Sequence, residues 1–321
     1  MDWTTKKILI TGGTGSFGRA FTRYALEHLN PNVIRIFSRD ELKQAEMREE
    51  FKSQKLRFFI GDIRDADRVE RALRGVDIVI HAAAMKRVEV CEYNPFEAIM
   101  TNIMGTQNVI NKAIDCGAEK IISISTDKAA NPVNLYGATK LCQEKIVTQS
   151  NSYVGPKKTR IACVRYGNVV GSRGSVVGIF KQQKDSGELT ITDDRMTRFW
   201  ITLDQAVRFV HSSIEMMRGG EIFVPKIPSM KVTDLAAAVA PKNKIRITGI
   251  RPGEKLHELM ITEDEARHCK DLGDRFLIEP EFPWWDSEFH SGGKSVSHEF
   301  RYASNTNTEW LTIEELKRLI G

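Results

Sequence analysis

The sequence predicts an α/β fold, in which a doubly wound parallel sheet carries a smaller mixed lobe toward the C-terminus. Two observations support this prediction. Short apolar runs alternate with helix-like stretches through residues 1–167, and the alternation breaks down over residues 168–321. The runs are continuous and rich in Ile and Val, as expected for parallel strands that are buried on both faces. We therefore expect two units, divided near residue 167.

In the first unit, segments with helical character lie between the expected strands. The expected strands are the runs at residues 6–11, 33–37, 56–61, 76–84, 120–125 and 159–166. The expected helices cover residues 17–29, 40–52, 65–73, 95–115 and 135–151. Alternation at this spacing is typical of a doubly wound, Rossmann-type sheet with helices on both faces.

The second unit is rich in loops. Strand-like runs at residues 221–225 and 244–248 can belong to a small lobe over the ends of the main strands, or they can rejoin the main sheet. Residues 280–306 are polar and irregular and contain two adjacent glycines, so we expect a long loop or a mobile segment there. A final helix follows Thr312, which can form a capping box with Glu315.

Composition disfavours several classes of protein. The chain has 321 residues, of which 41% are hydrophobic and 28% charged, and no apolar run approaches the roughly 18 residues that cross a bilayer. The start lacks the features of a secretory signal, so we expect a cytoplasmic location and no membrane partner. Five cysteines without a CxxC spacing predict neither a disulfide framework nor a metal site. The net charge is +5 without a Lys/Arg-rich block, which favours an anionic small molecule over nucleic acid.

A glycine-rich segment follows the first predicted strand and opens the first predicted helix. Glycines allow the backbone to approach a pyrophosphate closely, and a helix N-terminus supplies N–H donors and positive potential. The context predicts a dinucleotide site, whereas the alternative is a glycine-rich structural turn. The expected cofactor-binding residues are Gly12, Thr14, Gly15, Ser16, Phe17, Gly18, Ser38, Arg39, Asp62, Ile63, Ala82, Lys86, Tyr136 and Lys140.

The end of the second strand indicates which dinucleotide is bound. A carboxylate there would hold the ribose 2'-hydroxyl of NAD, whereas a basic residue would favour the 2'-phosphate of NADP. Ser38 and Arg39 come first and Asp40 follows, so we expect NADP; the alternative is that Arg39 is an ordinary surface charge. Asp62 and Ile63 follow the third strand, where an adenine ring can lie, although Asp62 can equally be a turn residue.

The segment STDKAANPVNLYGATK, residues 125–140, carries the candidate catalytic residues. Tyr136 and Lys140 share one helix face, and a nearby ammonium lowers the pKa of a phenol, which is about 10 when free. Tyr136 can then exchange a proton with a carbinol while hydride moves to or from nicotinamide. Thr126 ends the fifth strand and can hydrogen-bond the same oxygen. Asp127 and Lys128 lie directly beside this group; the alternative for them is a plain ion pair.

These motifs resemble those of the extended short-chain dehydrogenase/reductase superfamily, from the start of the chain to about residue 262. Within that superfamily the chain is similar to the inverting UDP-N-acetylglucosamine 4,6-dehydratases, the first enzymes of pseudaminic acid synthesis. The segments that carry the similarity are STDKAANPVNLYGATK, RYGNVVGSRGSVV, TDDRMTRFWIT, GGEIFVPKIPSMK and IRPGEKLHE, in that order.

The resemblance implies a reaction that needs both an acid and an amine. Oxidation at carbon 4 of the sugar makes the hydrogen on carbon 5 acidic, water is lost across carbons 5 and 6, and hydride returns to carbon 6, so that tightly bound NADP is regenerated. The resemblance implies Lys128 as the base, Asp127 as the acid and Tyr136 in the redox step. Retaining relatives carry Asp-Glu at this place, so Lys128 suggests inversion at carbon 5.

This assignment sets a condition on the two side chains. Lys128 must be neutral, so we expect burial and nearby Lys140 to lower its pKa. Asp127 must hold a proton, and the two groups are expected to titrate as a coupled pair.

The resemblance also implies where the substrate, UDP-N-acetylglucosamine, binds. A loop with arginines and glycines suits a diphosphate, and Arg195 and Arg198 add positive charge. The expected substrate-binding residues are Met85, Lys86, Asn168, Arg173, Ser175, Val176, Arg251 and Glu254. His81 is expected to be structural. Arg87 and Pro252 depart from the His and Ala that are more usual in the family, which bears on fine substrate preference.

Other functions stay open from the sequence. A nucleotide-sugar 4-epimerase or a retaining 4,6-dehydratase would share the fold, but the Asp127–Lys128 pair argues against both. A non-catalytic NADP-binding sensor is disfavoured by the intact set of Thr126, Tyr136 and Lys140. The resemblance implies a homo-oligomer, a dimer or a hexamer, in which the helix at residues 95–115 packs between subunits.

Overall fold

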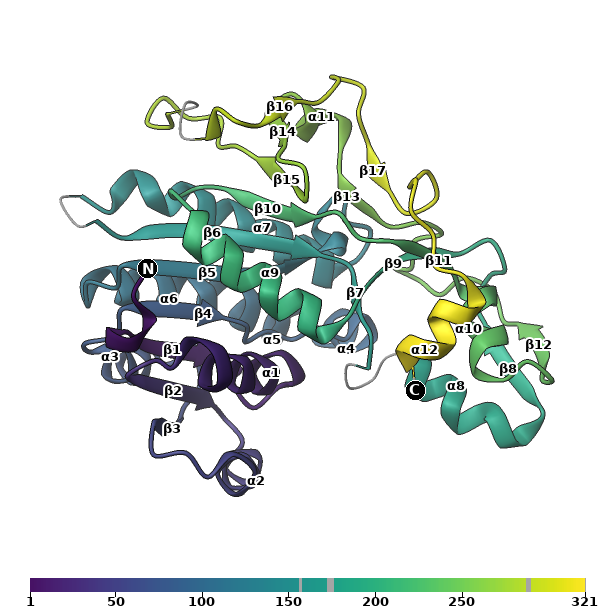
Figure 1. Cartoon of the computed structure of the whole chain (residues 1–321), viewed down its shortest axis with the longest axis horizontal. Helices are drawn as coiled ribbons and strands as arrows, with labels where there is room; N and C mark the ends of the chain where they lie inside the picture. The colour runs from purple at the N-terminus through teal and green to yellow at the C-terminus, as the bar shows by residue number, and fades with distance from the viewer. Residues whose placement is uncertain (156–157, 172–175, 287–289, 321) are drawn as a thin grey trace.

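The computed structural model describes residues 1–155, 158–171, 176–286 and 290–320. At its centre is a ten-stranded sheet in the order β16-β14-β15-β10-β6-β5-β4-β1-β2-β3 (Figure 1). Neighbouring strands run parallel from β3 to β10, and β15, β14 and β16 extend the sheet antiparallel. The strands are β1 (Lys7–Thr11), β2 (Val33–Ser38), β3 (Leu56–Ile60), β4 (Ile78–His81), β5 (Lys120–Thr126), β6 (Arg160–Tyr166), β10 (Ile222–Pro225), β14 (Cys269–Asp271), β15 (Arg275–Ile278) and β16 (Lys294–Ser295).

The sheet lies between two layers of helices (Figure 1). Helices α1 and α9 contact each other on one face, and α3, α6 and α7 form the layer on the other. The helices of this part are α1 (Ser16–Tyr24), α2 (Glu41–Phe51), α3 (Ala66–Leu73), α4 (Val88–Tyr93), α5 (Pro95–Ile99), α6 (Gly105–Asp115), α7 (Leu135–Gln149) and α9 (Leu203–Met216).

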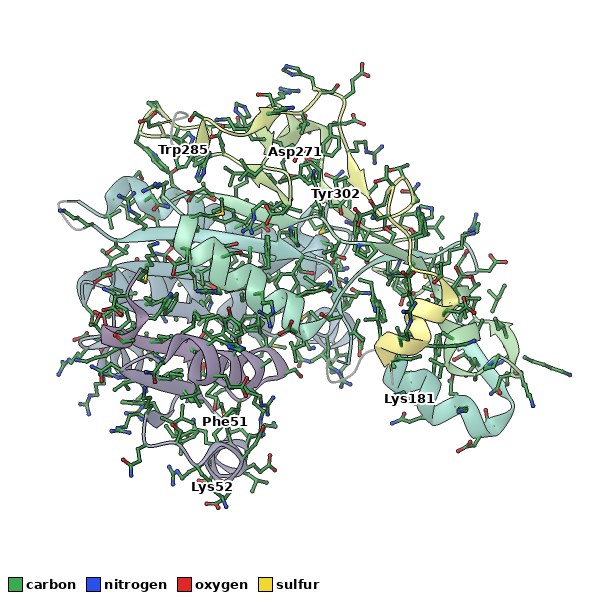
Figure 2. All side chains as sticks on the ribbon, in the orientation of Figure 1. Phe51, Lys52, Lys181, Asp271, Trp285 and Tyr302 are labelled. Carbon is green, nitrogen blue, oxygen red and sulfur yellow. The ribbon has the colours of Figure 1, made fainter. Side chains whose placement is uncertain are left out.

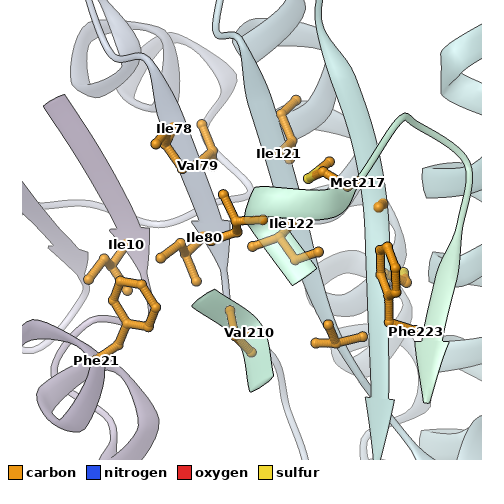
Figure 3. Packing of buried hydrophobic residues seen from close by; sticks show 14 of the residues in the cluster. Ile10, Phe21, Ile78, Val79, Ile80, Ile121, Ile122, Val210, Met217 and Phe223 are labelled. Carbon is orange, nitrogen blue, oxygen red and sulfur yellow. The ribbon is translucent and has the colours of Figure 1, made fainter. Parts of the chain in front are cut away.

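The core forms because the parallel strands are apolar on both faces. Ile10 of β1 lies in register with Ile80 of β4, which in turn lies beside Ile122 of β5. Phe21 of α1 and Val210 of α9 cover the face that these strands present (Figure 3). All five side chains are at most 1% exposed, so the central strands are held rigidly and their carboxyl ends are fixed in space.

The predicted α/β class, a doubly wound parallel sheet with a smaller mixed C-terminal lobe, is confirmed. All six predicted strands and five predicted helical segments of the first unit are present. The helix expected at residues 95–115 is α5 and α6 joined by one π-helical turn, η3 (Met100–Met104), which the pattern did not reveal. Helix α4 was not predicted, because its six residues are too few to show a period.

The second unit contributes to the main sheet and also forms a lobe of its own. Strand β10, the predicted run at 221–225, pairs with β6 and β15 in the main sheet. The lobe has its own apolar core, which includes Phe180, Trp200 and Leu316. Its elements are β7 (Asn168–Val169), α8 (Val176–Gln183), β8 (Glu188–Ile191), β9 (Thr197–Ile201), β11 (Ser229–Lys231), α10 (Val232–Val239), β12 (Lys244–Ile247) and α12 (Ile313–Ile320). The remaining elements are β13 (Leu259–Ile261), α11 (Glu263–Ala266) and β17 (Tyr302–Ala303); β13 pairs with β17, and Met260, Ile261 and Tyr302 pack in the main core.

The long loop expected at residues 280–306 is wrong in part. Residues 294–295 form β16 and residues 302–303 form β17, while residues 287–289 lie outside the described chain. Tyr302 is buried, and its hydroxyl donates to the carbonyl of Ile227 and accepts from its N–H, both at 2.9 Å (Figure 2). A single tyrosine anchored in this way orders a segment whose composition predicts a loop.

The capping box predicted before the last helix is confirmed. The Thr312 hydroxyl accepts from the Glu315 N–H at 3.3 Å, and the Glu315 carboxylate accepts from the Thr312 N–H at 2.8 Å. Within the described ranges, no helix has the length and hydropathy that a membrane span requires.

Candidate active site

The candidate catalytic residues gather where β5 ends. Thr126 is the last residue of the strand, and the short turn η4 (Asp127–Ala129) follows it directly. The Thr126 hydroxyl donates to Oδ1 of Asp127 at 2.9 Å and accepts from the Lys128 N–H at 3.4 Å. These hydrogen bonds fix the turn, so Asp127 and Lys128 are held in one defined arrangement directly after the strand.

Helix α7 packs tightly against this turn. Asn134 caps the helix, because its Oδ1 accepts from the Gly137 N–H at 2.7 Å. A Cβ atom on Gly137 would lie 2.2 Å from the carbonyl oxygen of Lys128. Only glycine therefore allows α7 to come this close to the catalytic turn, and the first turn of α7 is where Tyr136 lies.

Tyr136 lies beside the turn and is 9% exposed. Burial raises its pKa to about 12, while the Lys128 ammonium and a hydrogen bond with Thr126 act in the opposite direction. We expected the Lys140 ammonium to be the group that lowers the pKa of Tyr136. In this ligand-free arrangement Lys140 donates to the Ile124 carbonyl at 2.6 Å and to Gln143, and burial lowers its own pKa to about 8.

Asp127 and Lys128 form a close pair with a third charged residue. Nζ of Lys128 is 3.1 Å from Oδ1 of Asp127 and 3.4 Å from Oε1 of Glu258. Asp127 is fully buried and Glu258 is 3% exposed. Burial and the nearby Glu258 carboxylate raise the pKa of Asp127 against the effect of Lys128, which is the direction that the expected role as an acid requires.

The expected lowering of the pKa of Lys128 is wrong for this arrangement. Burial does act to lower it, but the carboxylates of Asp127 and Glu258 outweigh burial, so the pKa of Lys128 is raised. The sequence could not show this, because Glu258 lies far from Lys128 along the chain. Lys128 must therefore give up a proton before it can act as a base.

The loop after β4 is fixed by a buried asparagine. Asn102, within the π-helical turn η3, accepts from the Met85 N–H at 2.8 Å and donates to the Met85 carbonyl at 2.9 Å. π-Helical turns are frequent at functional sites because the widened turn re-aims a side chain. Met85 also packs against Tyr136, so this loop borders the catalytic residues, whereas Lys86 is exposed.

His81 is structural, as expected. Its Nδ1 lies 2.8 Å from the Thr11 hydroxyl and its Nε2 lies 2.9 Å from the Thr106 hydroxyl. Burial lowers the pKa of His81 to about 3, so the ring is neutral and ties β1 to β4 and α6.

The glycine-rich segment has the geometry of a pyrophosphate cradle. Gly12 has φ +65°, and a Cβ on it would lie 2.9 Å from the Ala83 backbone, next to Ala82. Gly15 is the N-cap of α1, and a Cβ on Gly18 would lie 2.4 Å from a backbone oxygen of the same loop. A cavity of about 310 Å³ opens here, lined by Thr14, Ser16, Arg19, Ala20, Arg23, Glu50, Gly171 and Leu203. The donors and the positive charge fit a dinucleotide diphosphate.

The end of β2 carries the residues predicted to select the cofactor. The Ser38 hydroxyl accepts from Gln44 at 3.0 Å, and Arg39 is 62% exposed and lies 3.6 Å from Asp62. The Asp62 carboxylate also accepts from the Arg64 side chain at 2.7 Å. Ile63 is 4% exposed and packs on Gly105, so it lies beneath this edge of the site.

The predicted substrate-binding residues fall into three groups. Asn168 lies at the catalytic pair, with its Oδ1 3.4 Å from Nζ of Lys128. Arg251 and Glu254 form one turn, joined by an ion pair of 4.0 Å, and the carbonyl of Gly253, which lies between them, accepts from Asn134 at 2.7 Å. Val176 begins α8 in the lobe. Arg173 and Ser175 lie outside the described residues.

Three residues of the site were missed from the sequence: Asn102, Asn134 and Glu258. Asn134 offered a signal, because Asn before a helix is a common N-cap. Glu258 ends the segment IRPGEKLHE, where a charged residue is expected to be exposed. Nothing in that segment indicates that Glu258 is buried against Lys128.

Comparisons with known proteins agree with this arrangement. A family model described as "Polysaccharide biosynthesis protein" matches residues 8–280. A Campylobacter jejuni protein named UDP-N-acetylglucosamine 4,6-dehydratase (inverting) is 53% identical over 98% of this chain and 97% of its own length. A Rickettsia canadensis protein named UDP-glucose 4-epimerase is 42% identical over 98% of this chain and 95% of its own. The X-ray structure of Pen from Bacillus thuringiensis superposes with a TM-score of 0.92 at 40% identity, covering 100% of this chain and 98% of that one. The chain belongs to the polysaccharide biosynthesis protein family.

Proposed function

We propose that this protein is an NADP-dependent, configuration-inverting 4,6-dehydratase of UDP-N-acetylglucosamine. Its product would be UDP-2-acetamido-2,6-dideoxy-β-L-arabino-hexos-4-ulose, which can enter pseudaminic acid synthesis. The observation that carries the proposal is the ion pair of buried Asp127 with partly buried Lys128, 3.1 Å apart, beside Tyr136 at the end of β5. An epimerase has no use for an elimination acid and base at this place, whereas a dehydratase needs both.

The site residues divide the reaction between them. Tyr136 takes the proton of the carbon-4 hydroxyl, helped by its hydrogen bond with Thr126, and NADP supplies the hydride acceptor and later the hydride. Asp127, whose pKa is raised by burial, protonates the departing hydroxyl on carbon 6. Lys128 takes the proton from carbon 5. Lys140 holds the strand end through its hydrogen bond to the Ile124 carbonyl and would add positive charge near a bound cofactor.

The substrate is proposed to enter from the lobe. Asn168, Val176, Arg173 and Ser175 would line its path, with Met85 and Lys86 at the nicotinamide end. The turn of Arg251 and Glu254 suits a nucleotide, since an arginine matches phosphate oxygens and a carboxylate accepts from ribose hydroxyls. Ser38 and Arg39, with no carboxylate at the end of β2 itself, support NADP over NAD.

We also propose a cytoplasmic location and a homo-oligomer. Tyr93 of α4 and Phe96 of α5 are 87% and 68% exposed, which supports a subunit contact on these helices. Light scattering coupled to size-exclusion chromatography tests this, and a monomer at all concentrations would contradict it.

The function is tested by an NMR time course with UDP-N-acetylglucosamine in deuterated water, first without added cofactor and then with NADP. The expected product is the 4-keto-6-deoxy sugar of L-arabino configuration, deuterated at carbon 5. Retention at carbon 5 would contradict the role of Lys128. A second candidate function, 4-epimerisation, is favoured by relatives such as the one from Rickettsia canadensis, and a galacto-configured product without loss of water would support it.

A further inference from the structure

The Lys128 ammonium has three acceptors around it, and one of them has no role in the reaction as described. Asp127 lies at 3.1 Å, Asn168 at 3.4 Å and Glu258 at 3.4 Å. Asn168 cannot take a proton, and Asp127 must keep its own to act as the acid. Among the contacts of Lys128 in the described chain, Glu258 is thus the remaining ionisable acceptor.

Glu258 is held in place by β9. The Arg198 guanidinium donates to the backbone carbonyls of Lys255 and Leu256, both at 3.0 Å, and its Nε lies 3.6 Å from the Glu258 carboxylate. Arg198 therefore fixes both the backbone before Glu258 and the Glu258 carboxylate. A buried carboxylate is costly unless it is paired, so its placement against Lys128 is a built feature of the site.

Two buried oxygens at this cluster lack hydrogen-bond partners. They are Oδ2 of Asp127 and Oε2 of Glu258, each inaccessible to solvent. A buried carboxylate with one unpartnered oxygen becomes less costly when it is protonated, because protonation removes the charge. Both carboxyl groups are thus placed to hold a proton when the amine between them is neutral.

We propose that Glu258 accepts the proton of the resting Lys128 ammonium, so that Lys128 becomes a free amine while Asp127 stays protonated. This inference rests on the proposed dehydratase reaction. In this step the Lys128 N–H bond breaks and an O–H bond forms on Glu258, which converts an ammonium–carboxylate pair into a neutral amine and a neutral carboxylic acid. The amine then takes the carbon-5 proton, and Asp127 gives its proton to the departing hydroxyl. Glu258 acts through Lys128 and is a positioning residue that does not touch the sugar.

The charged groups around the cluster set the direction of this transfer. Lys128 and Asp127 face it from η4, Arg198 from β9, and Lys255 from the segment before β13, where its Nζ donates to the Ala130 carbonyl at 2.5 Å. Tyr136 faces Lys128 from α7. His257 points away, with its Nδ1 2.8 Å from the Thr197 hydroxyl. At rest the surrounding cations favour a charged Glu258. We expect the proton transfer when the bound sugar displaces solvent, because the Lys128 ammonium and the Glu258 carboxylate are then less stable as charged groups.

The test compares E258Q with wild type and with a matched control, E263Q. Gln has the shape of Glu but cannot take the proton, and Glu263 is 60% exposed on α11, outside the site. For each protein we would measure kcat and KM from pH 6 to 9, the Tm, and the absorbance of reduced cofactor in a single turnover. We expect kcat of E258Q to fall about 10²-fold with KM changed less than about threefold, with reduced cofactor accumulating because oxidation at carbon 4 still occurs.

The competing explanation gives the opposite result. If Glu258 only raised the pKa of Lys128 by its charge, E258Q would lower that pKa, keep or raise kcat at neutral pH, and move the acidic limb of the pH profile down. That outcome would overturn the proposal. A folded E258Q that loses both carbon-4 oxidation and deuterium exchange would also overturn the proposal, because Glu258 would then serve an earlier step.

A second variant covers the case in which E258Q does not fold. E258D keeps an ionisable oxygen at a longer distance from Lys128, and we expect a folded protein whose kcat is lower than that of wild type and higher than that of K128M. A folded E258D with the activity of K128M, or with that of wild type, would overturn the proposal. A wild-type protein that forms no keto sugar would instead refute the dehydratase function itself.

Discussion

The contact between helix α7 and the catalytic turn makes Gly137 a sensitive position. In G137A the new Cβ would lie 2.2 Å from the Lys128 carbonyl oxygen, whereas ordinary contacts begin at 3.4 Å. The Lys128 backbone must therefore move by about 1.2 Å. That oxygen belongs to the turn that carries both Asp127 and Lys128, so the displacement reaches the proposed acid and the proposed base directly.

The magnitude follows from two opposing effects. Overpacking of this kind costs about 3 kcal/mol, and replacing a helical glycine by alanine returns about 1 kcal/mol. We expect G137A to lower the free energy of unfolding by about 2 kcal/mol. A misplacement of about 1 Å in a catalytic group can cost about 10²-fold in rate, so we expect a loss of kcat of that order.

The control is G178A in helix α8, where a Cβ would meet no atom within 4 Å. It should be neutral or stabilising by up to about 1 kcal/mol, with unchanged kcat. Denaturant unfolding and the NMR turnover assay measure both effects. If G137A had the stability and kcat of wild type, the turn would be free to move, and the claim that the helix fixes the acid and the base would fail.

Three further predictions concern other parts of the site. N134A removes the cap of α7 and the hydrogen bond from Asn134 to Gly253, so we expect the free energy of unfolding to fall by about 1 kcal/mol. We also expect a rise in KM for the nucleotide sugar that exceeds any fall in kcat. An effect on kcat alone would contradict the link between Asn134 and the turn of Arg251 and Glu254. R39A should raise the Kd for NADP about 10- to 100-fold in calorimetric titrations and leave the Kd for NAD unchanged, because only the 2'-phosphate gains a charge-assisted hydrogen bond; equal losses for both would argue for NAD. The pKa of His81 is about 3 in the folded protein, below its value of about 6.5 in the unfolded chain. Between these two pH values only the unfolded state binds a proton at His81, so the free energy of unfolding falls as the pH is lowered from about 6.5. The stability difference between wild type and H81Q should shrink by about 1.4 kcal/mol per pH unit between pH 6 and 5, and a constant difference in chemical unfolding would show that His81 titrates normally.

The first half of the fold was predictable because its signals are local. Strands such as β4 and β5 are continuous apolar runs, and the glycines at residues 12 to 18 directly follow another such strand, β1. The same holds for Thr126, Asp127, Lys128, Tyr136 and Lys140, which occupy a single segment of 16 residues. The order of strands in the second half was left open, because β10 pairs with β6 although α8, β8, β9 and α9 lie between them along the chain, and no local pattern encodes that pairing.

The protonation state of the site was not predictable from its own segment. The expectation of a neutral Lys128 amine rested on burial at the strand end and on nearby Lys140, which both act to lower its pKa. The structure adds Glu258 from a loop that Arg198 clamps, and two carboxylates reverse the direction of the pKa shift of Lys128. A charge balance is a property of everything packed around a group, so it appears only when the chain is folded.

The pairing of Lys128 with Glu258 also has a consequence for synthesis of the chain. Glu258 is made 130 residues after Lys128, which at synthesis rates of about 5–20 residues per second is a delay of roughly 6 to 26 seconds. During this interval the parallel strands up to β6 can already be paired, yet the Asp127–Lys128 turn lacks its covering loop. A ribosome-bound chain thus has a solvated, open catalytic turn, and the enzyme becomes competent only when the segment around residue 258 leaves the exit tunnel.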